Sequence, residues 1–185
     1  HFDVNKTLFS KWLSIKIKLT LTGGNMGRII EQDRSLVFAA DVEPDKFEYI
    51  MQKLKGVPGL GGVKLGFELG LGLSLGVATD IVKDADPKLA VIYDHQKAGT
   101  DIPRTAENFG RTMEKGGVDG AILFPFAGPV VQKSWTSELF DRGITPIVGA
   151  KMTHEEMAQS DGGYIVDTAF AKIFEIAIQQ GVKDF

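Results

Sequence analysis

The sequence predicts an α/β protein in which helices cover a parallel β-sheet. Short apolar runs without polar–apolar alternation, typical of strands that are buried on both faces, recur along the chain from Ser35. Stretches of helical period separate them. Most of the 22 glycines fall at the junctions between the two kinds of segment, as many short strand–helix connections require. This alternation fits an open doubly wound sheet and a closed (β/α)8 barrel equally well.

The expected strands share a short apolar core that ends near a glycine or a charged residue. In chain order they are residues 36–40, 62–66, 89–93, 118–124 and 145–149, followed by a sixth strand at 182–185 where the given chain stops. The expected helices share an apolar stripe on one face. They are residues 44–55, 68–83, 103–115, 129–141 and 168–180.

Local signals place the ends of these helices. Pro44, Pro103 and Pro129 each stand at a first turn, where the missing amide hydrogen of proline costs nothing. Gly181 follows the last helix in the position of a C-terminal cap. Three glycines weaken the first half of the helix at 68–83. They are Gly70, Gly72 and Gly76.

Residues 1–25 differ from the rest and are interpreted as an N-terminal extension, either non-native or peripheral. Lys16 and Lys18 interrupt its apolar stretch, which is too short to span a bilayer and does not have the form of a signal peptide. Met26 is a candidate natural start, so that the α/β domain occupies residues 26–185. A basic amphipathic surface segment and an edge strand at 14–20 are the competing interpretations.

Composition excludes several classes of function. The formal net charge is -3, and no basic cluster occurs after residue 20, which argues against nucleic acid as the main partner. The chain has no cysteine, so disulfides, thiolate catalysis and cysteine-ligated zinc or iron–sulfur sites are excluded. A reducing, cytoplasmic location fits this composition, and we expect no membrane partner.

Charged residues at the ends of consecutive strands predict a shared polar site. Asp41 follows the first strand, Lys64 lies in the second, and Asp94 follows the third, with Lys97 and Asp101 just beyond. A single aspartate there would be a helix cap, but three charges in consecutive units must be paired or face a polar cavity. Lys97, held between two carboxylates, stays protonated and suits a proton donor better than a Schiff-base nucleophile.

Other motifs are weaker. The glycines at 70–76 do not match a dinucleotide-binding loop, because the third glycine is one place late. The segment after His154 fails as a zinc motif, since Ala158 stands where the second histidine belongs. His95 is interpreted as a loop or structural histidine rather than a metal ligand. We therefore predict no metal site.

The polar segments together resemble orotidine 5'-monophosphate decarboxylase. Three segments carry most of the resemblance: Ala39-Ala40-Asp41-Val42, Val63-Lys64-Leu65-Gly66, and Asp94 to Lys97 to Asp101-Ile102-Pro103-Arg104-Thr105. Two shorter segments support it: Phe124-Pro125-Phe126-Ala127-Gly128 and Met152-Thr153-His154. The resemblance extends from about residue 36 to 185, and the order of the segments is more specific than any one of them.

The resemblance implies a (β/α)8 TIM-type barrel with its active site at the carboxyl ends of the strands. Residues 26–185 would supply about six of the eight strands of such a barrel and end within the sixth βα unit. The phosphate-gripping loop and arginine of the family would lie beyond residue 185. The implied protein is a cytoplasmic homodimer with shared active sites, a carboxy-lyase that makes UMP in pyrimidine biosynthesis.

The resemblance also assigns roles to residues. Asp94 would lie near the substrate carboxylate, Lys97 would protonate C6 as carbon dioxide leaves, and Lys64 would join the charge network and contact the ribose. Asp41 would contact the ribose as well. Two residues, Asp101 and Thr105, would reach the active site of the neighbouring subunit, and Thr153 would hydrogen-bond the pyrimidine. The family needs no cofactor, organic or metallic.

One departure from the family pattern bears on the mechanism. Lys97 follows Asp94 by three residues and Asp101 follows Lys97 by four, where the family has two and three. Side chains three apart on a strand point to opposite faces, so Asp94 and Lys97 converge only if the strand ends or bulges between them. Two other functions stay open: a superfamily decarboxylase or aldolase that acts on a sugar phosphate, with or without a metal, and a non-catalytic nucleotide-binding or scaffold barrel.

Overall fold

The structure is a computed structural model that describes residues 27–95 and 98–185. The expectations for residues 1–25, for Met26 and for Lys97 concern residues outside these ranges. In the part of the chain that is described, no helix is long and apolar enough to cross a membrane.

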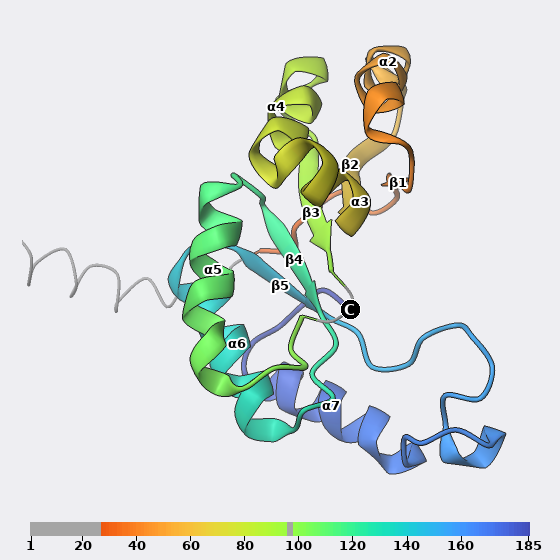
Figure 1. Ribbon diagram of the computed structural model, residues 1–185, viewed down its shortest axis with the longest axis vertical. Helices are drawn as coiled ribbons and strands as arrows, with labels where there is room; N and C mark the ends of the chain where they lie inside the picture. Colours follow the sequence, from red (N-terminus) through yellow and green to blue (C-terminus); the bar gives the residue numbers. More distant parts are fainter. Residues whose placement is uncertain (1–26, 96–97) are drawn as a thin grey trace, which may run out of the picture.

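Five parallel strands form one sheet, and their spatial order follows their order in the chain (Figure 1). They are β1 (Leu36–Ala40), β2 (Leu60–Gly66), β3 (Ala90–Asp94), β4 (Gly120–Leu123) and β5 (Thr145–Val148). A doubly wound sheet reverses its strand order at a switch point, whereas a barrel adds each strand beside the last. The parallel α/β fold is confirmed, and its strand order is that of an incomplete (β/α)8 barrel.

The sixth expected strand is present as a single bridge. Asp184 pairs in parallel with Ile147 of β5, and the amide of Val148 donates to the Asp184 carbonyl at 3.1 Å. Residues 182–185 therefore lie where the next strand of a barrel belongs, on the far side of β5 from β4. One bridge is shorter than the four-residue strand that the sequence predicts.

Helices cover the outer face of the sheet in two groups. They are α2 (Pro44–Leu54), α4 (Leu75–Ala85), α5 (Ala106–Lys115), α6 (Pro129–Asp141) and α7 (Asp167–Gln179). Figure 1 shows α2 and α4 side by side at one end and α5, α6 and α7 together at the other. The residues of β2, β3 and β4 that face these helices belong to one buried core. They are Val63, Leu65, Val91, Tyr93, Ala121 and Leu123.

The helix predicted at 68–83 is divided into three parts. A short turn, α3 (Phe67–Leu69), continues into a π-helix, η1 (Gly70–Ser74), and only then into α4. The helical backbone is interrupted at Ser74, which has φ of +70° and caps α4. A Cβ on Gly70 would lie 3.0 Å from the ring of Tyr93, and one on Gly72 only 2.6 Å from the ring of Pro44. The glycines let the wider turn pack closely on its neighbours, where an ordinary α-helix was expected.

The inner face of the sheet carries the alternate side chains. Lys64, Ile92, Ile122 and Ile147 line a hollow of about 700 Å³ together with part of the segment 28–35. That segment packs closely on the strands, since a Cβ on Gly62 would lie 3.3 Å from a methyl of its Ile30. Lys64 is thus placed on the concave side, where a barrel encloses its interior.

Close packing of β2 on β3 gives a stability prediction. A Cβ at Gly62 would lie 2.8 Å from the backbone oxygen of Ala90, which cannot rotate away. We expect Gly62→Ala to lower the free energy of unfolding by about 1–3 kcal/mol in urea denaturation. The control is Gly76→Ala in α4, where a Cβ meets nothing within 4 Å; it should raise stability by about 0.4–1 kcal/mol. Equal effects of the two substitutions would contradict this account.

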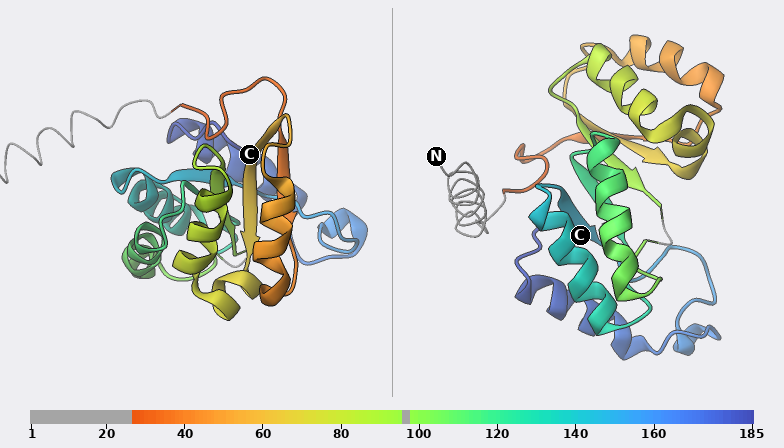
Figure 2. Two further views of the ribbon diagram at one scale, coloured as in Figure 1. Left: turned by 90° about the horizontal axis from the view of Figure 1, so that it is seen from above. Right: turned by 60° about the vertical axis from the view of Figure 1, so that its left-hand side comes forward.

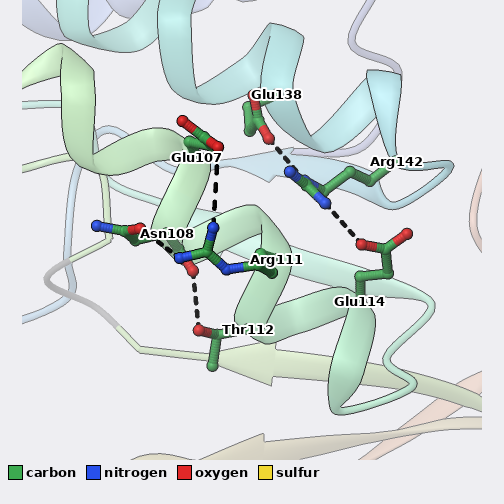
Figure 3. A network of polar contacts seen from close by, with 7 residues as sticks. All are labelled: Glu107, Asn108, Arg111, Thr112, Glu114, Glu138 and Arg142. Atoms are coloured by element: carbon green, nitrogen blue, oxygen red, sulfur yellow. Dashed lines mark hydrogen bonds and ion pairs between the residues drawn. The ribbon is translucent and has the colours of Figure 1, made fainter.

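A charged network joins α5 to α6 (Figure 3). Arg142 donates from Nε to Glu138 and from a terminal nitrogen to Glu114, both at 2.6 Å, and these bonds raise the pKa of its guanidinium. Gly110 leaves the space that Arg142 crosses, because a Cβ there would lie 2.9 Å from its Cδ. Beside this network on α5, Arg111 pairs with Glu107 at 3.8 Å. These contacts hold α5 and α6 together. The loop before α5, which contains Asp101, packs on α6.

The segment between β5 and α7, residues 149–166, leaves the body of the molecule and returns (Figures 1 and 2). It contains a short 3-10 helix, η3 (Gln159–Asp161), and a parallel bridge between Ala158 and Ile165. Tyr164 is fully exposed on it. The sequence did not predict this excursion as a structural unit.

Candidate active site

An ion pair joins the ends of β2 and β3 on the concave face. Lys64 Nζ lies 2.6 Å from Asp94 Oδ2. Strand register explains the contact: Gly66 pairs with Asp94, and Lys64 precedes Gly66 by two residues on the same face. Since Gly66 has no side chain, the lysine can extend along the strand to the carboxylate. The sequence placed Lys64 within the second strand and Asp94 after the third, and the structure brings them into direct contact.

Asp94 is the more buried member of the pair. Its side chain is 6% exposed and that of Lys64 is 26% exposed. Oδ2 accepts from the lysine, but Oδ1 is buried without a hydrogen-bond partner among the residues that the structure describes. A buried polar atom without a partner costs about 1–3 kcal/mol, so native proteins rarely keep one without a use. Asp94 Oδ1 is therefore available to a ligand or to another charged group.

Asp41 lies at the same edge of the sheet. It directly follows β1, its side chain is exposed, and a Cβ on Gly66 would lie 3.1 Å from its Oδ1. The ends of β1, β2 and β3 thus bring Asp41, Lys64 and Asp94 to one place. This is the carboxyl edge, where parallel α/β enzymes keep their chemistry.

The chain turns immediately after Asp94, where β3 ends. The amide of Ala98 donates to the carbonyl of His95 at 2.7 Å, and the amide of Phe124 donates to the carbonyl of Ala98 at 2.8 Å. Gly99 has φ of +87°, and a Cβ there would lie 3.1 Å from Pro125 Cα. The strand has therefore ended before Lys97, which is the condition that the unusual Asp94–Lys97 spacing requires. Lys97 itself lies outside the described residues.

The loop with Asp101 and Thr105 is fastened to α6. Trp135 Nε1 donates to the carbonyl of Ile102 at 3.2 Å, and Ser134 Oγ donates to that of Pro103 at 3.0 Å. The Asp101 carboxylate is exposed and accepts from the amide of Ile102 at 2.6 Å. Thr105 begins α5 from a 3-10 turn, η2 (Pro103–Thr105), and donates to the Ile102 carbonyl at 2.7 Å.

Asp101, Thr105 and Thr153 are not joined to the ion pair. Among the described residues, no hydrogen bond or salt bridge links any of the three to Lys64 or Asp94. Thr153 is exposed on the excursion at 149–166. The structure describes six of the predicted site residues. It brings three of them together, Asp41, Lys64 and Asp94, and it shows no bond from the other three to the ion pair.

Sequence reasoning missed one contact beside Asp94. Tyr93 Oη lies 3.1 Å from His95 Nδ1, and the two rings stack with centroids 5.8 Å apart. Burial, with a smaller contribution from the charge of Asp94, raises the pKa of the Tyr93 phenol. Residues 93 and 95 flank Asp94 at the spacing that puts two side chains on one face of an extended chain, and this signal was available in the sequence. Among residues 27–95 and 98–185, no cluster of three or more potential ligands could hold a metal ion.

Comparison with solved structures identifies the fold. The chain is similar to an orotidine 5'-monophosphate decarboxylase from Methanocaldococcus jannaschii, with a TM-score of 0.65 and 22% identity over 80% of this chain and 68% of that one. An orotidine 5'-phosphate decarboxylase from Lactobacillus acidophilus gives a TM-score of 0.62 and 18% identity over 81% and 69% of the two chains.

An uncharacterized conserved protein from Geobacillus kaustophilus gives a TM-score of 0.60 and 21% identity over 79% and 70% of the two chains. No protein-family profile matches the chain, and no curated protein matches it. At these identities the similarity establishes that the chain shares the fold of these decarboxylases.

Proposed function

We propose that this protein is a carboxy-lyase that converts orotidine 5'-monophosphate to UMP in the cytoplasm. The observation that carries the proposal is the 2.6 Å pair of Lys64 with a buried Asp94 that has one oxygen without a described partner, at the carboxyl edge of the sheet. The fold shared with two decarboxylases supports it. The order of Asp41, Lys64 and Asp94 along the sequence is a second, separate observation that supports the proposal.

In the proposed chemistry, the negative charge of Asp94 repels the substrate carboxylate, and the positive charges of the lysines stabilise the product of bond cleavage. The substrate carboxylate binds close to Asp94, and repulsion between the two anions is relieved when carbon dioxide leaves. As the C–C bond breaks, its electron pair stays on C6, where the ammonium groups of Lys64 and Lys97 stabilise the developing charge. Lys97 then gives its proton to C6, and solvent returns a proton to the lysine. No metal or organic cofactor enters this scheme.

The remaining residues bind substrate in this proposal. Asp41, exposed beside Gly66, accepts hydrogen bonds from the ribose hydroxyls. Thr153, exposed on the excursion at 149–166, donates a hydrogen bond to the pyrimidine. Asp101 and Thr105, which make no contact with the pair in their own chain, act in the site of a second subunit.

The proposed sharing of sites can be tested with mixed dimers. Lys97→Ala and Asp101→Ala chains should each be inactive alone, but a dimer of one with the other has one site with both residues intact. Random exchange between isologous subunits should restore about a quarter of wild-type turnover. Turnover that stays at background after mass spectrometry has verified subunit exchange would contradict the role of Asp101 in the neighbouring site.

A second assay separates this function from its alternatives. Loss of orotidine monophosphate is followed by absorbance with wild-type protein, with and without a chelator. We expect equal turnover in the two conditions. Turnover that a chelator abolishes would favour a metal-dependent enzyme of the superfamily that acts on a sugar phosphate. Saturable binding of UMP without any turnover would favour a non-catalytic barrel.

A further inference from the structure

We propose that Tyr93 and His95 form a positioning pair that fixes the direction of the Asp94 side chain toward Lys64. The two residues flank Asp94 in the chain, and the 3.1 Å contact between Tyr93 Oη and His95 Nδ1 joins them on the face of the strand opposite to the carboxylate. The inference rests on the proposed function for its catalytic consequence and on described residues alone for its geometry.

The tyrosine end of the pair is held by the core. Tyr93 is 7% exposed and belongs to the buried cluster between the sheet and its helices. The π-helix η1 closes over its ring, since a Cβ on Gly70 would lie 3.0 Å from Cε2 and 3.3 Å from Oη. The phenol oxygen is thereby fixed in place, with little room to move.

The histidine end of the pair continues the alternation of β3 by one residue. The strand β3 itself ends at Asp94, yet the ring of His95 stacks on that of Tyr93 with an interplanar angle of 29°. The His95 carbonyl then accepts from Ala98 at 2.7 Å, which begins the turn. With residues 93 and 95 clamped on the outer face, residue 94 must point to the inner face. The pair therefore prevents the last residue of β3 from fraying, at the one position where fraying would separate Asp94 from Lys64.

In this inference the Tyr93 hydroxyl is the donor of the hydrogen bond and His95 Nδ1 is the acceptor. Burial and the adjacent Asp94 carboxylate raise the pKa of Tyr93, so the hydroxyl keeps its proton. His95 Nδ1 then accepts a hydrogen bond from that hydroxyl, and the ring carries its own hydrogen on Nε2. The pair thus selects one tautomer of His95, and this tautomer is a measurable signature.

The first arm of the test needs no substrate. The chain has 3 histidines, so the imidazole signals of ¹⁵N-labelled protein can be assigned by substitution. We expect the His95 ring of the wild type to be fixed as the Nε2–H tautomer and to become a mixture in Tyr93→Phe. Tyr49→Phe, which changes an exposed tyrosine on α2, should leave the His95 signals unchanged. An unchanged tautomer in Tyr93→Phe overturns the inference.

The second arm measures turnover. Tyr93→Phe and His95→Ala should each lower kcat by about 10- to 100-fold, the loss expected when a reacting group is misplaced by up to 1 Å, with KM altered by less than about 3-fold. The double variant should be no worse than either single one, because the two residues act as a unit. His95→Asn, which keeps an acceptor near the position of Nδ1, should recover most of kcat. A kcat within about 3-fold of wild type in Tyr93→Phe overturns the inference.

The two arms separate this inference from the proposed function. If the wild type does not decarboxylate orotidine monophosphate, the proposed function fails, and the positioning role is then decided by the ¹³Cγ resonance of Asp94 at fixed pH. A shift of that resonance in Tyr93→Phe, absent in Tyr49→Phe, supports the role, and an unmoved resonance overturns it.

Discussion

Asp94→Asn should abolish most decarboxylation while the protein stays folded. The substitution keeps the shape of the side chain and removes its charge, and with it the repulsion that carbon dioxide loss relieves. We expect kcat/KM for orotidine monophosphate to fall by about 10²- to 10³-fold, the range for a single preorganised electrostatic group. We also expect a loss of about 1–3 kcal/mol in unfolding free energy, because Lys64 loses its partner but keeps 26% exposure to water.

Asp119→Asn is the matched control for this substitution. Asp119 accepts from Lys83 and from the amide of Val91, both at 2.8 Å, at the opposite end of the strands. Its replacement should lower the free energy of unfolding by a similar amount, about 1–3 kcal/mol, because hydrogen bonds to a charged group are weakened. It should leave kcat/KM within about 3-fold of wild type. If turnover falls equally in the two variants, Asp94→Asn loses activity because the protein is destabilised. That result would contradict a role of Asp94 in catalysis.

Lys64→Met should have the larger effect on stability. It leaves a carboxylate with 6% exposure and no described partner for either oxygen. Breaking a fully buried pair by removing one partner costs about 3–5 kcal/mol, and the partial exposure of Lys64 lowers our expectation to about 2–4 kcal/mol in urea unfolding. Turnover should fall by about 10²- to 10³-fold, since a cation that stabilises the developing charge is lost.

Two further variants test the physical reason for this loss. Lys64→Met combined with Asp94→Asn should be more stable than Lys64→Met alone, because no uncompensated charge remains. Lys83→Met, which breaks the more exposed pair with Asp119, should cost less than Lys64→Met. Additive losses in the double variant would show that Lys64 and Asp94 do not act as a charge pair.

The order of strands and helices was predictable because strands that are buried on both faces of a sheet have continuous apolar sequences. The strand expected at 145–149 is β5 and the helix expected at 129–141 is α6, each within one residue of its predicted ends. Asp41, Lys64 and Asp94 were predicted to converge for the same reason, since the carboxyl ends of parallel strands meet at one edge. These predictions depend only on local pattern and on general topology.

Contacts between distant segments could not be predicted in this way. Gly70 packs against the ring of Tyr93 and Gly72 against that of Pro44, and neither neighbour is close in sequence. The excursion at 149–166 carries no strong periodicity, so the exposed position of Thr153 was not foreseen. The end of β3 at Asp94 and the hydrogen bond between the Ala98 amide and the His95 carbonyl also depend on tertiary contacts, such as the bond from the Phe124 amide to the Ala98 carbonyl.

The central claim is that the charged residues at the carboxyl edge decarboxylate orotidine monophosphate with Lys97 as the proton donor. The most direct measurement compares the rate of orotidine monophosphate loss, followed by absorbance, for wild type and Lys97→Ala. We predict metal-independent turnover by the wild type and a rate for Lys97→Ala lower by at least about 10²-fold, the minimum for loss of a general acid. No turnover by wild type, or turnover that Lys97→Ala retains, would contradict the claim.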